Sequence, residues 1–289
     1  MTVSPVTLPI LLAVLGAALL HASWNALVKS AGDKFMTSAR VCLWCGLIAV
    51  AVAAATPVPA REAWPFVLAS ALIHVVYFVG VGRLYRTADL SVAYPLMRGA
   101  APMIATALAF ATLGERPAGL ALLGIVALVA GIVGMGASGF SQGRIDGRTL
   151  AVALANGAVI ALYSVIDGQG ARVSGPGMAY AFGYNAWADA LTAIFYAPLL
   201  FAWRGRGVAR ELTQAPGRAA AGGLAAFVGY ALVVWAMTRA AIGEVAALRE
   251  TSVLFAAVIG VLALGEPFRH ARAGATLLIL AGVAAIKFA

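Results

Sequence analysis

The chain has 289 residues, of which 63% are hydrophobic and 11% are charged. An ordinary soluble domain carries roughly 25% charged residues, so this chain has too few polar side chains to coat a water-soluble globule. The formal net charge of +9 does not indicate nucleic acid, because the basic residues occur in small groups between apolar runs and form no basic face. The composition therefore indicates an integral membrane protein, with the lipid bilayer as its surroundings.

Ten stretches of about 20 apolar residues are long enough to cross a hydrocarbon layer of about 30 Å as helices. They cover residues 8–28, 36–55, 64–83, 91–112, 118–138, 149–167, 178–202, 217–238, 244–264 and 271–288. None of them shows the strict alternation of a barrel strand. No basic segment precedes the first stretch, so we expect a retained helix and not a cleaved signal peptide. The sequence predicts an all-α membrane protein with ten transmembrane helices.

The two halves of the chain resemble each other. The segment YPLMRGAAPMIATALAFATLGERP (94–117) aligns with VAALRETSVLFAAVIGVLALGEP (245–267), which places Arg98 on Arg249 and repeats the tripeptide LGE. Five spans is an odd number, so the second copy must enter the membrane in the opposite orientation. We therefore expect two inverted five-helix repeats, residues 1–143 and 144–289, that together form one membrane domain. Inverted repeats are typical of transporters.

Lys and Arg residues gather in the loops that follow odd-numbered spans. Lys29 and Lys34 flank the first of these loops, and Arg204, Arg206 and Arg210 follow the seventh span. By the positive-inside rule, these loops face the cytoplasm and both chain termini lie outside.

The five-plus-five pattern, the paired LGE turns at 113–115 and 264–266, and the Gly-rich fifth and tenth spans resemble the drug/metabolite transporter (DMT) superfamily, specifically its EamA-type members. The resemblance covers essentially the whole chain. It implies a multi-pass carrier of the bacterial inner (cytoplasmic) membrane, with spans one to four and six to nine around a central cavity. Such carriers are often exporters of amino acids or related metabolites. YddG-type aromatic amino-acid exporters are the nearest group.

Polar side chains inside the predicted spans are the candidates for a binding site, because polar groups in hydrocarbon are tolerated mainly where they face a cavity or a partner helix. In the first span, His21, Trp24 and Asn25 share one helical face. The other candidates for substrate contact are His74, Tyr77, Tyr94, Arg98, Tyr163, Ser164, Tyr230 and Arg249. The alternative is that these side chains only hydrogen-bond or pack across helix interfaces.

Arg98 and Arg249 lie inside spans at equivalent positions. A buried guanidinium needs a carboxylate, a helix carbonyl or an anionic substrate as its partner. The acidic candidates for an ion pair or a proton carrier are Asp167, Asp189, Glu244 and Glu250. Proton-coupled members of the resembled superfamily place a glutamate in the first span, but this chain has no acidic residue there. Proton antiport through that position is therefore not expected, and facilitated release down a gradient is the alternative.

Cys42 and Cys45 form a C-x-x-C pattern without the further Cys or His pair that a zinc site needs, so we expect two buried, small apolar residues. No metal ion or cofactor is expected. The glycines of the fifth and tenth spans, such as Gly124, Gly131 and Gly282, predict close helix packing. In some relatives these spans mediate dimerisation, so the monomer and the homodimer both remain open.

The function expected from these features is export of amino acids, aromatic ones among them, or of related small metabolites by alternating access. The small-molecule substrate is expected to bind between the repeats. The alternative is a membrane-embedded transferase or lipid-linked enzyme that uses His and Asp for acid/base chemistry. Such an enzyme needs grouped carboxylates, and the sequence contains no D-x-x-D or H-x-x-x-D cluster.

Overall fold

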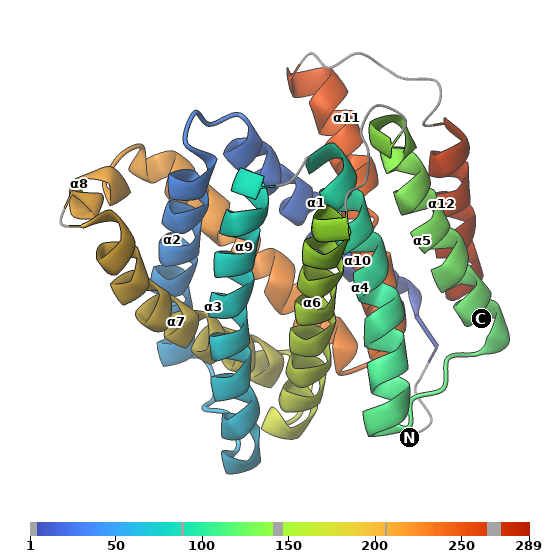
Figure 1. Cartoon of the computed structure of the whole chain (residues 1–289). Helices are drawn as coiled ribbons and strands as arrows, with labels where there is room; N and C mark the ends of the chain where they lie inside the picture. The colour runs from blue at the N-terminus through green and yellow to red at the C-terminus, as the bar shows by residue number, and fades with distance from the viewer. Residues whose placement is uncertain (1–4, 88–89, 141–146, 206, 265–272) are drawn as a thin grey trace.

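The computed structural model describes the backbone of residues 5–87, 90–140, 147–205, 207–264 and 273–289, and all side chains there except those of 80–87, 90–94, 136–140, 148–149 and 264. Within the described ranges, all regular secondary structure is helical (Figure 1). The helices are α1 (Leu8–Lys29), α2 (Lys34–Ala55), the short 3₁₀ turn η1 (Arg61–Ala63), α3 (Trp64–Thr87), α4 (Leu90–Leu113), α5 (Gly119–Phe140), α6 (Gly147–Ser174), α7 (Gly177–Arg204), α8 (Val208–Leu212), α9 (Pro216–Met237), α10 (Ile242–Arg249), α11 (Ser252–Leu264) and α12 (Ala273–Lys287).

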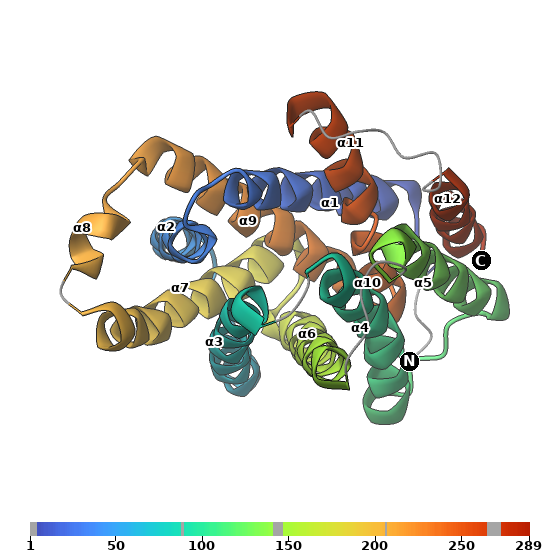
Figure 2. The ribbon, with the colours of Figure 1, turned by 45° about the horizontal axis from the view of Figure 1, so that its top comes forward.

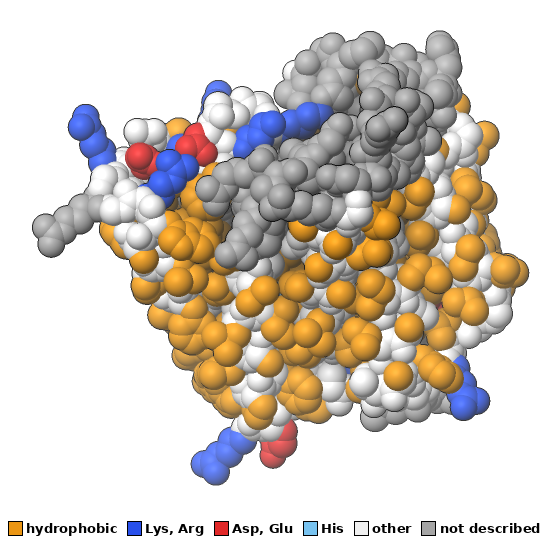
Figure 3. Space-filling model, in the orientation of Figure 1, with side chains coloured by type: hydrophobic (Ala, Val, Ile, Leu, Met, Phe, Trp, Pro, Cys, Tyr) orange, Lys and Arg blue, Asp and Glu red, His pale blue; other side chains and the backbone are white. Residues whose placement is uncertain are grey.

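Eight helical segments of the described chain are long and apolar enough to cross a membrane. They correspond to predicted spans one to four and six to nine. The helices of spans five and ten are also apolar, but their segments that qualify, Gly119–Met135 and Ala273–Lys287, are shorter. Apolar side chains cover a broad band around the middle of the visible face, and charged side chains lie toward its two ends (Figure 3). The chain is a multi-pass membrane protein, while the total of ten spans stays a prediction.

Local sequence sets where several helices begin and end. The Asp33 carboxylate accepts a hydrogen bond from the Met36 amide at the start of α2, with an N–O distance of 3.0 Å. Pro216 occupies the first turn of α9, where its missing N–H leaves no bond unmade. Gly114 follows α4 with a φ of 66°, a left-handed conformation that glycine adopts without steric strain.

The two ends of α2 define the two ends of the bundle. At one end, Arg204, the last residue of α7, pairs with Asp33 of the α1–α2 loop, with an N–O distance of 3.3 Å. At the other end, Ala60 N donates to Ser174 O at 3.0 Å, so the α2–α3 loop lies beside the end of α6. We call these the Asp33 end and the Ser174 end. Helix α1 finishes at the first, and α6, which runs beyond its predicted limit at residue 167, finishes at the second.

Packing between the two halves follows a regular pattern. Helix α1 packs on α9 and on α10 and α11, while α6 packs on α3 and on α4. Helices α2 and α7 contact each other, as do α5 and α12. In the repeat predicted from the sequence, α1 corresponds to α6, α2 to α7, α3 to α9, α4 to α10 and α11, and α5 to α12. Exchanging each helix for its counterpart gives this same set of contacts. Helices α5 and α12 lie together at one edge of the bundle, away from α2 and α7 (Figures 1 and 2).

Glycines let α5 and α12 approach with their backbones in contact. A Cβ atom at Gly124 would lie 2.8 Å from Gly282 O, and one at Gly131 would lie 2.7 Å from Ala275 O. Both distances are too short for a real carbon–oxygen contact, so only glycine fits at these positions without a shift. The close packing predicted from these glycines is therefore present.

The ninth predicted span, residues 244–264, is not one continuous helix. Helix α10 ends at Arg249, Glu250 and Thr251 form a turn, and α11 begins at Ser252. No Pro or Gly, the residues most often found at kinks, lies at this break. The turn is instead held by α4, because Arg98 binds Glu250 and donates to Ser252 Oγ at 2.7 Å. A tertiary contact thus accounts for an interruption that local sequence does not predict.

Candidate functional site

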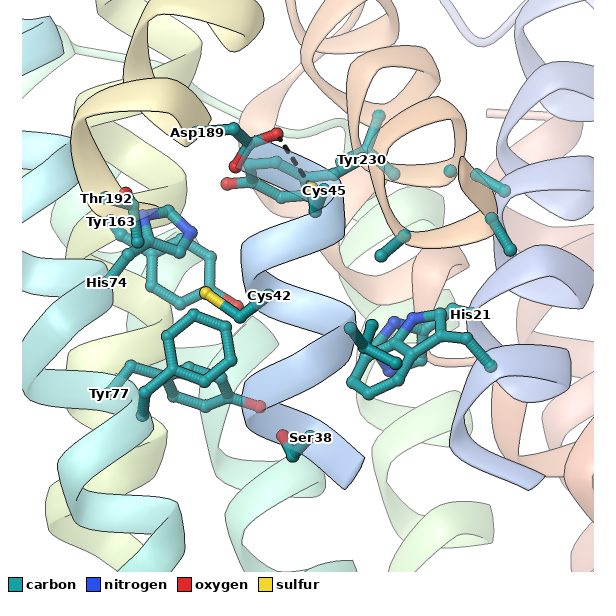
Figure 4. Close-up of a pocket in the computed structure, with 18 of the residues that line it drawn as sticks. His21, Ser38, Cys42, Cys45, His74, Tyr77, Tyr163, Asp189, Thr192 and Tyr230 are labelled. Carbon is teal, nitrogen blue, oxygen red and sulfur yellow. Dashed lines mark hydrogen bonds between the residues drawn. The ribbon is translucent and has the colours of Figure 1, made fainter. Parts of the chain in front are cut away.

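A cavity lies between seven helices (Figure 4). Its wall is formed by residues of α1, α2, α3, α6, α7, α9 and α10. The space of about 860 Å³ among the lining atoms includes the part that is open to the surroundings. Eight of the residues proposed from the sequence line it: His21, Trp24, His74, Tyr77, Tyr163, Asp189, Tyr230 and Arg249.

Aromatic rings from three helices meet around Tyr163. The His74 ring stacks on Tyr163 with 4.2 Å between ring centroids, and Tyr77 and Tyr230 approach the same ring edge-on at 5.8 and 5.9 Å. Offset and edge-to-face arrangements of this kind are favourable and rigid. The cluster therefore forms a mostly apolar aromatic surface that also carries the hydroxyl groups of three tyrosines.

The three polar or aromatic side chains predicted from α1 differ in what they contact: two line the cavity, and one bonds to the backbone of its own helix. His21 and Trp24 line the cavity, and their rings meet edge-on at 5.2 Å. Asn25 does not line the cavity, because its side-chain amide donates to His21 O, one turn back on the same helix, at 2.8 Å. Of the three side chains predicted to face inward together, two do so.

Arg98 and Arg249 converge on one carboxylate. Arg98 Nε lies 2.5 Å from Glu250 Oε2, and Arg249 Nη2 lies 3.5 Å from Glu250 Oε1. All three side chains are buried. Arg249 also lines the cavity, with its guanidinium carbon 5.9 Å from the centre of the Tyr163 ring. Its Nε has no hydrogen-bond partner among the described residues. Arg249 is thus a cation at the cavity wall with an N–H group left over.

The remaining acidic candidates have separate surroundings. Asp167 is buried and accepts hydrogen bonds from Tyr184 at 3.0 Å and Tyr230 at 2.5 Å. Asp189 lines the cavity and accepts from the Asn185 amide at 2.9 Å. Glu244 is buried in the first turn of α10 and does not line the cavity. The two buried arginines therefore pair with Glu250, and not with Asp167, Asp189 or Glu244.

Two further candidates lie outside the cavity or the described side chains. Ser164 is fully buried and donates to Ile160 O, one turn back on its own helix, at 2.7 Å. This bond and its burial make it a packing residue of α6. The side chain of Tyr94 lies outside the described residues.

Several lining residues were missed by reasoning from the sequence: Ser38, Cys42, Cys45, Phe78 and Thr192. The two cysteines are buried, as expected, but they also face the cavity, and Cys45 Sγ lies 3.6 Å from Asp189 Oδ2. Cys42 and Cys45 are one turn apart in α2, which itself contacts α7 and α9. Helical spacing puts them on one face, but only the tertiary packing shows that this face borders the cavity.

Comparison with known proteins finds a family that resembles one half of the chain. Residues 149–288 match the model of the EamA-like transporter family. This half of the chain is similar to EamA-like transporter domains. Members of that family are membrane transporters of small molecules, and a cavity enclosed by apolar helices agrees with that similarity.

The fold of the whole chain, and not only of its EamA-like half, has a solved counterpart. One crystal structure of a protein is similar over 97% of this chain and over 96% of the chain in that crystal, with a TM-score of 0.74. At 19% identity this similarity speaks to the fold alone. No curated protein matches the sequence.

Proposed function

We propose that this protein is a secondary carrier that exports a small amphipathic metabolite, an amino acid with an aromatic or aliphatic side chain, across the bacterial inner membrane. The substrate binds in the central cavity, and alternating access between two inverted repeats, residues 1–143 and 144–289, carries it outward. Aromatic amino acids, the substrates implied by the resemblance to YddG-type exporters, suit the ring cluster around Tyr163.

One observation carries this proposal: Arg249 and the ring cluster share a cavity wall. Arg249 contacts Glu250 only at 3.5 Å, its Nε has no hydrogen-bond partner among the described residues, and its guanidinium carbon lies 5.9 Å from the centre of the Tyr163 ring. Guanidinium binds carboxylate through charge-assisted hydrogen bonds that are stronger than neutral ones. The substrate's carboxylate then binds Arg249, and its side chain packs against His74, Tyr77 and Tyr163.

The packing pattern supports the repeat mechanism. Helices α1 and α6, which occupy equivalent places in the two halves, finish at opposite ends of the bundle. The main contacts between the halves persist when the halves are exchanged, although the contact of α10 with α5 has no counterpart of similar extent between α4 and α12. Two copies in opposite orientation provide two conformations of similar energy around one site near the midplane.

Transport by purified protein in lipid vesicles tests the proposal. Radiolabelled phenylalanine, leucine and lysine are offered, and the vesicle contents are checked for chemical change. We expect phenylalanine or leucine to cross unaltered, and Arg249→Gln to raise KM by about 10- to 100-fold, since a hydrogen bond to a charged group contributes about 1.5–3 kcal/mol. Arg204→Gln is the control, because Arg204 forms an exposed ion pair far from the cavity. Conversion to a new product, or unchanged uptake by Arg249→Gln, would reject the carrier with this site.

A further inference from the structure

Asp189 is the acidic side chain among the described residues that line the cavity. Its Oδ2 accepts the Asn185 amide at 2.9 Å and lies 3.6 Å from Cys45 Sγ. Both donors bind the same carboxylate oxygen, and Figure 4 shows the contact of the carboxylate with Cys45 as a dashed line. The second oxygen, Oδ1, makes no hydrogen bond recorded among the described residues.

Among the described residues, the buried acids Asp167 and Glu244 and the cavity-facing Asp189 form no ion pair with Lys or Arg, and Asp189 is the one of these three that lines the cavity. Glu115 and Glu250 each form an ion pair with an arginine, and Asp167 accepts two tyrosine hydroxyls. In the described part of the chain, Asp189 has no Lys, Arg or His within ion-pair distance. A carboxylate kept in an apolar surrounding without a cation is costly, and ionisable groups inside membranes usually serve function.

We propose that Asp189, oriented by Asn185, is the subsite for a positively charged nitrogen of the substrate. This inference rests on the proposed carrier function. Arg249 and Asp189 belong to α10 and α7, so the cavity presents one positive and one negative group on different helices. A molecule with both an ammonium and a carboxylate carries a partner for each of these two groups. The substrate class is therefore zwitterionic, and a monocarboxylate or a simple amine leaves one of them unpaired.

Matched ligand pairs test the subsite. Binding of phenylalanine and of 3-phenylpropionate, which lacks the amino group, is measured on purified protein, together with leucine and 4-methylpentanoate. We expect the amino acid of a pair to bind about 10- to 100-fold more tightly, the range for a charged hydrogen bond. In Asp189→Asn this ratio falls to about one, because the neutral amide lacks the charge, while the deamino acid binds as before. Asp33→Asn, at an exposed carboxylate on the surface, keeps the ratio.

Each other outcome overturns the inference. An unchanged ratio in Asp189→Asn shows that the ammonium binds elsewhere. If Asp189→Asn keeps the ratio but loses the pH dependence of transport, Asp189 transfers protons instead. Other titratable groups of this region include Asp167, Tyr230 and Cys45. If the parent protein binds neither member of either pair, the carrier proposal fails and the subsite fails with it.

A second inference rests on a different group, the ion pair of Glu115 and Arg172. Arg172 Nη1 lies 2.5 Å from Glu115 Oε1, and the Glu115 side chain is 2% exposed. Arg172 lies in the last turn of α6. Glu115 directly follows Gly114, the first residue after α4. The pair therefore lies at the Ser174 end of the bundle.

The same two side chains also cap two other helices. Arg172 donates to Met237 O at 2.8 Å and to Ala240 O at 3.0 Å, the carbonyls at the end of α9 and in the turn after it. Glu115 Oε2 accepts the Ile242 amide, the first of α10, at 2.9 Å. Cations suit helix C-termini and anions suit N-termini. One ion pair thus holds α4, α6, α9 and α10 together.

A hydroxyl–carboxylate layer separates this ion pair from the cavity. Along α6, Tyr163 lines the cavity, Asp167 lies one turn further, and Arg172 lies beyond it. Asp167 is bound by Tyr184 of α7 and Tyr230 of α9. Toward the Asp33 end the cavity lining reaches Ser38, the fifth residue of α2.

The geometry points to the Glu115–Arg172 pair as a gate that closes the cavity at the Ser174 end. A buried ion pair contributes little net stability but specifies one arrangement, because the desolvation of both charges offsets their attraction. Separation of the pair frees the α9–α10 turn from α6 and α4, and the Asp167 layer then opens as α9 moves. On the orientation expected from the basic loops, this end faces outside.

The protein supplies its own reporters for this gate, because its two cysteines, Cys42 and Cys45, both line the cavity. A membrane-impermeant methanethiosulfonate is applied from either side of oriented vesicles, and the rate of cysteine labelling is measured. In Arg172→Gln we expect labelling from the Ser174 end to rise at least about tenfold, a modest population shift. Arg172→Lys keeps the charge but loses the fork of N–H donors. We therefore expect its labelling rate to lie between those of the parent and of Arg172→Gln.

The control is Arg204→Gln, which removes the exposed ion pair at the Asp33 end and leaves labelling from the Ser174 end unchanged. A pair with only a structural role behaves differently: Arg172→Gln and Glu115→Gln lower the melting temperature but are labelled from the same side and at the same rate as the parent. That result overturns the gate and leaves transport by the parent protein untouched, so it is distinct from a failure of the carrier proposal.

Discussion

Arg98 of α4 and Glu250, in the turn between α10 and α11, form a buried ion pair whose Nε–Oε2 distance is 2.5 Å. Arg249 approaches the other oxygen of the same carboxylate at 3.5 Å. The two arginines align in the repeat predicted from the sequence, but their surroundings differ. Arg98 is bound to Glu250 and Ser252 in the helix interface, whereas Arg249 reaches the cavity.

Replacing Glu250 by Gln is expected to destabilise the protein by about 3–5 kcal/mol, because it leaves two buried guanidinium groups without a carboxylate. The measurement is the free energy of unfolding in detergent. Glu62→Gln, at an exposed position beside α3, serves as the control and stays within about 0.5 kcal/mol of the parent. Equal stability of both variants would contradict the role of Glu250 as the shared anion.

The two tyrosines bound to Asp167 allow stability to be separated from transport. Tyr184→Phe and Tyr230→Phe each remove one hydroxyl donor, at 3.0 and 2.5 Å respectively. Each change is expected to cost about 1–3 kcal/mol of stability, the range for a lost hydrogen bond to a buried charge. Tyr230 lines the cavity and Tyr184 does not. Only Tyr230→Phe should therefore change the KM of transport, as measured in vesicles; equal effects of both variants on KM would contradict this assignment.

Thiol chemistry should report on occupancy of the cavity. N-ethylmaleimide, which crosses membranes, is expected to inactivate transport by modifying Cys42 or Cys45, because both side chains line the cavity. A transported amino acid should slow inactivation in proportion to its occupancy of the site. The double variant Cys42→Ala/Cys45→Ala should resist the reagent. Inactivation at the parent rate in that variant would place the sensitive group elsewhere.

The contact between α5 and α12 should depend on glycine. Gly124→Ala places a Cβ atom 2.8 Å from Gly282 O, so the two backbones must move apart, at a cost of about 1–3 kcal/mol. Gly16→Ala is the matched control, because no atom lies within 4 Å of a Cβ there. We expect the first change to lower the melting temperature and the second to leave it unchanged or raise it, since alanine favours helix. A melting temperature of Gly124→Ala equal to that of the parent would contradict the tight contact.

Part of the candidate site was predictable, because helical spacing is a local property. His21 and Trp24 lie three residues apart on one face, and both reach the cavity. The same reasoning failed for Asn25 and Ser164, which bond to carbonyls of their own helices. A polar side chain in a membrane helix can be satisfied by its own backbone or by a cavity, and sequence spacing does not distinguish these outcomes.

The sequence by itself determined the class of the protein and most of its apolar spans, while the repeat that aligns Arg98 with Arg249 stays a prediction. These features follow from apolar content and from repetition along the chain, which are independent of how helices meet. Tertiary structure alone decided that Glu250 joins the two arginines, that Cys42 and Cys45 face the cavity, and that α10 and α11 are separate helices. Each of these depends on contacts between segments distant in sequence. For Glu250, the desolvation of the buried charges selects the partner.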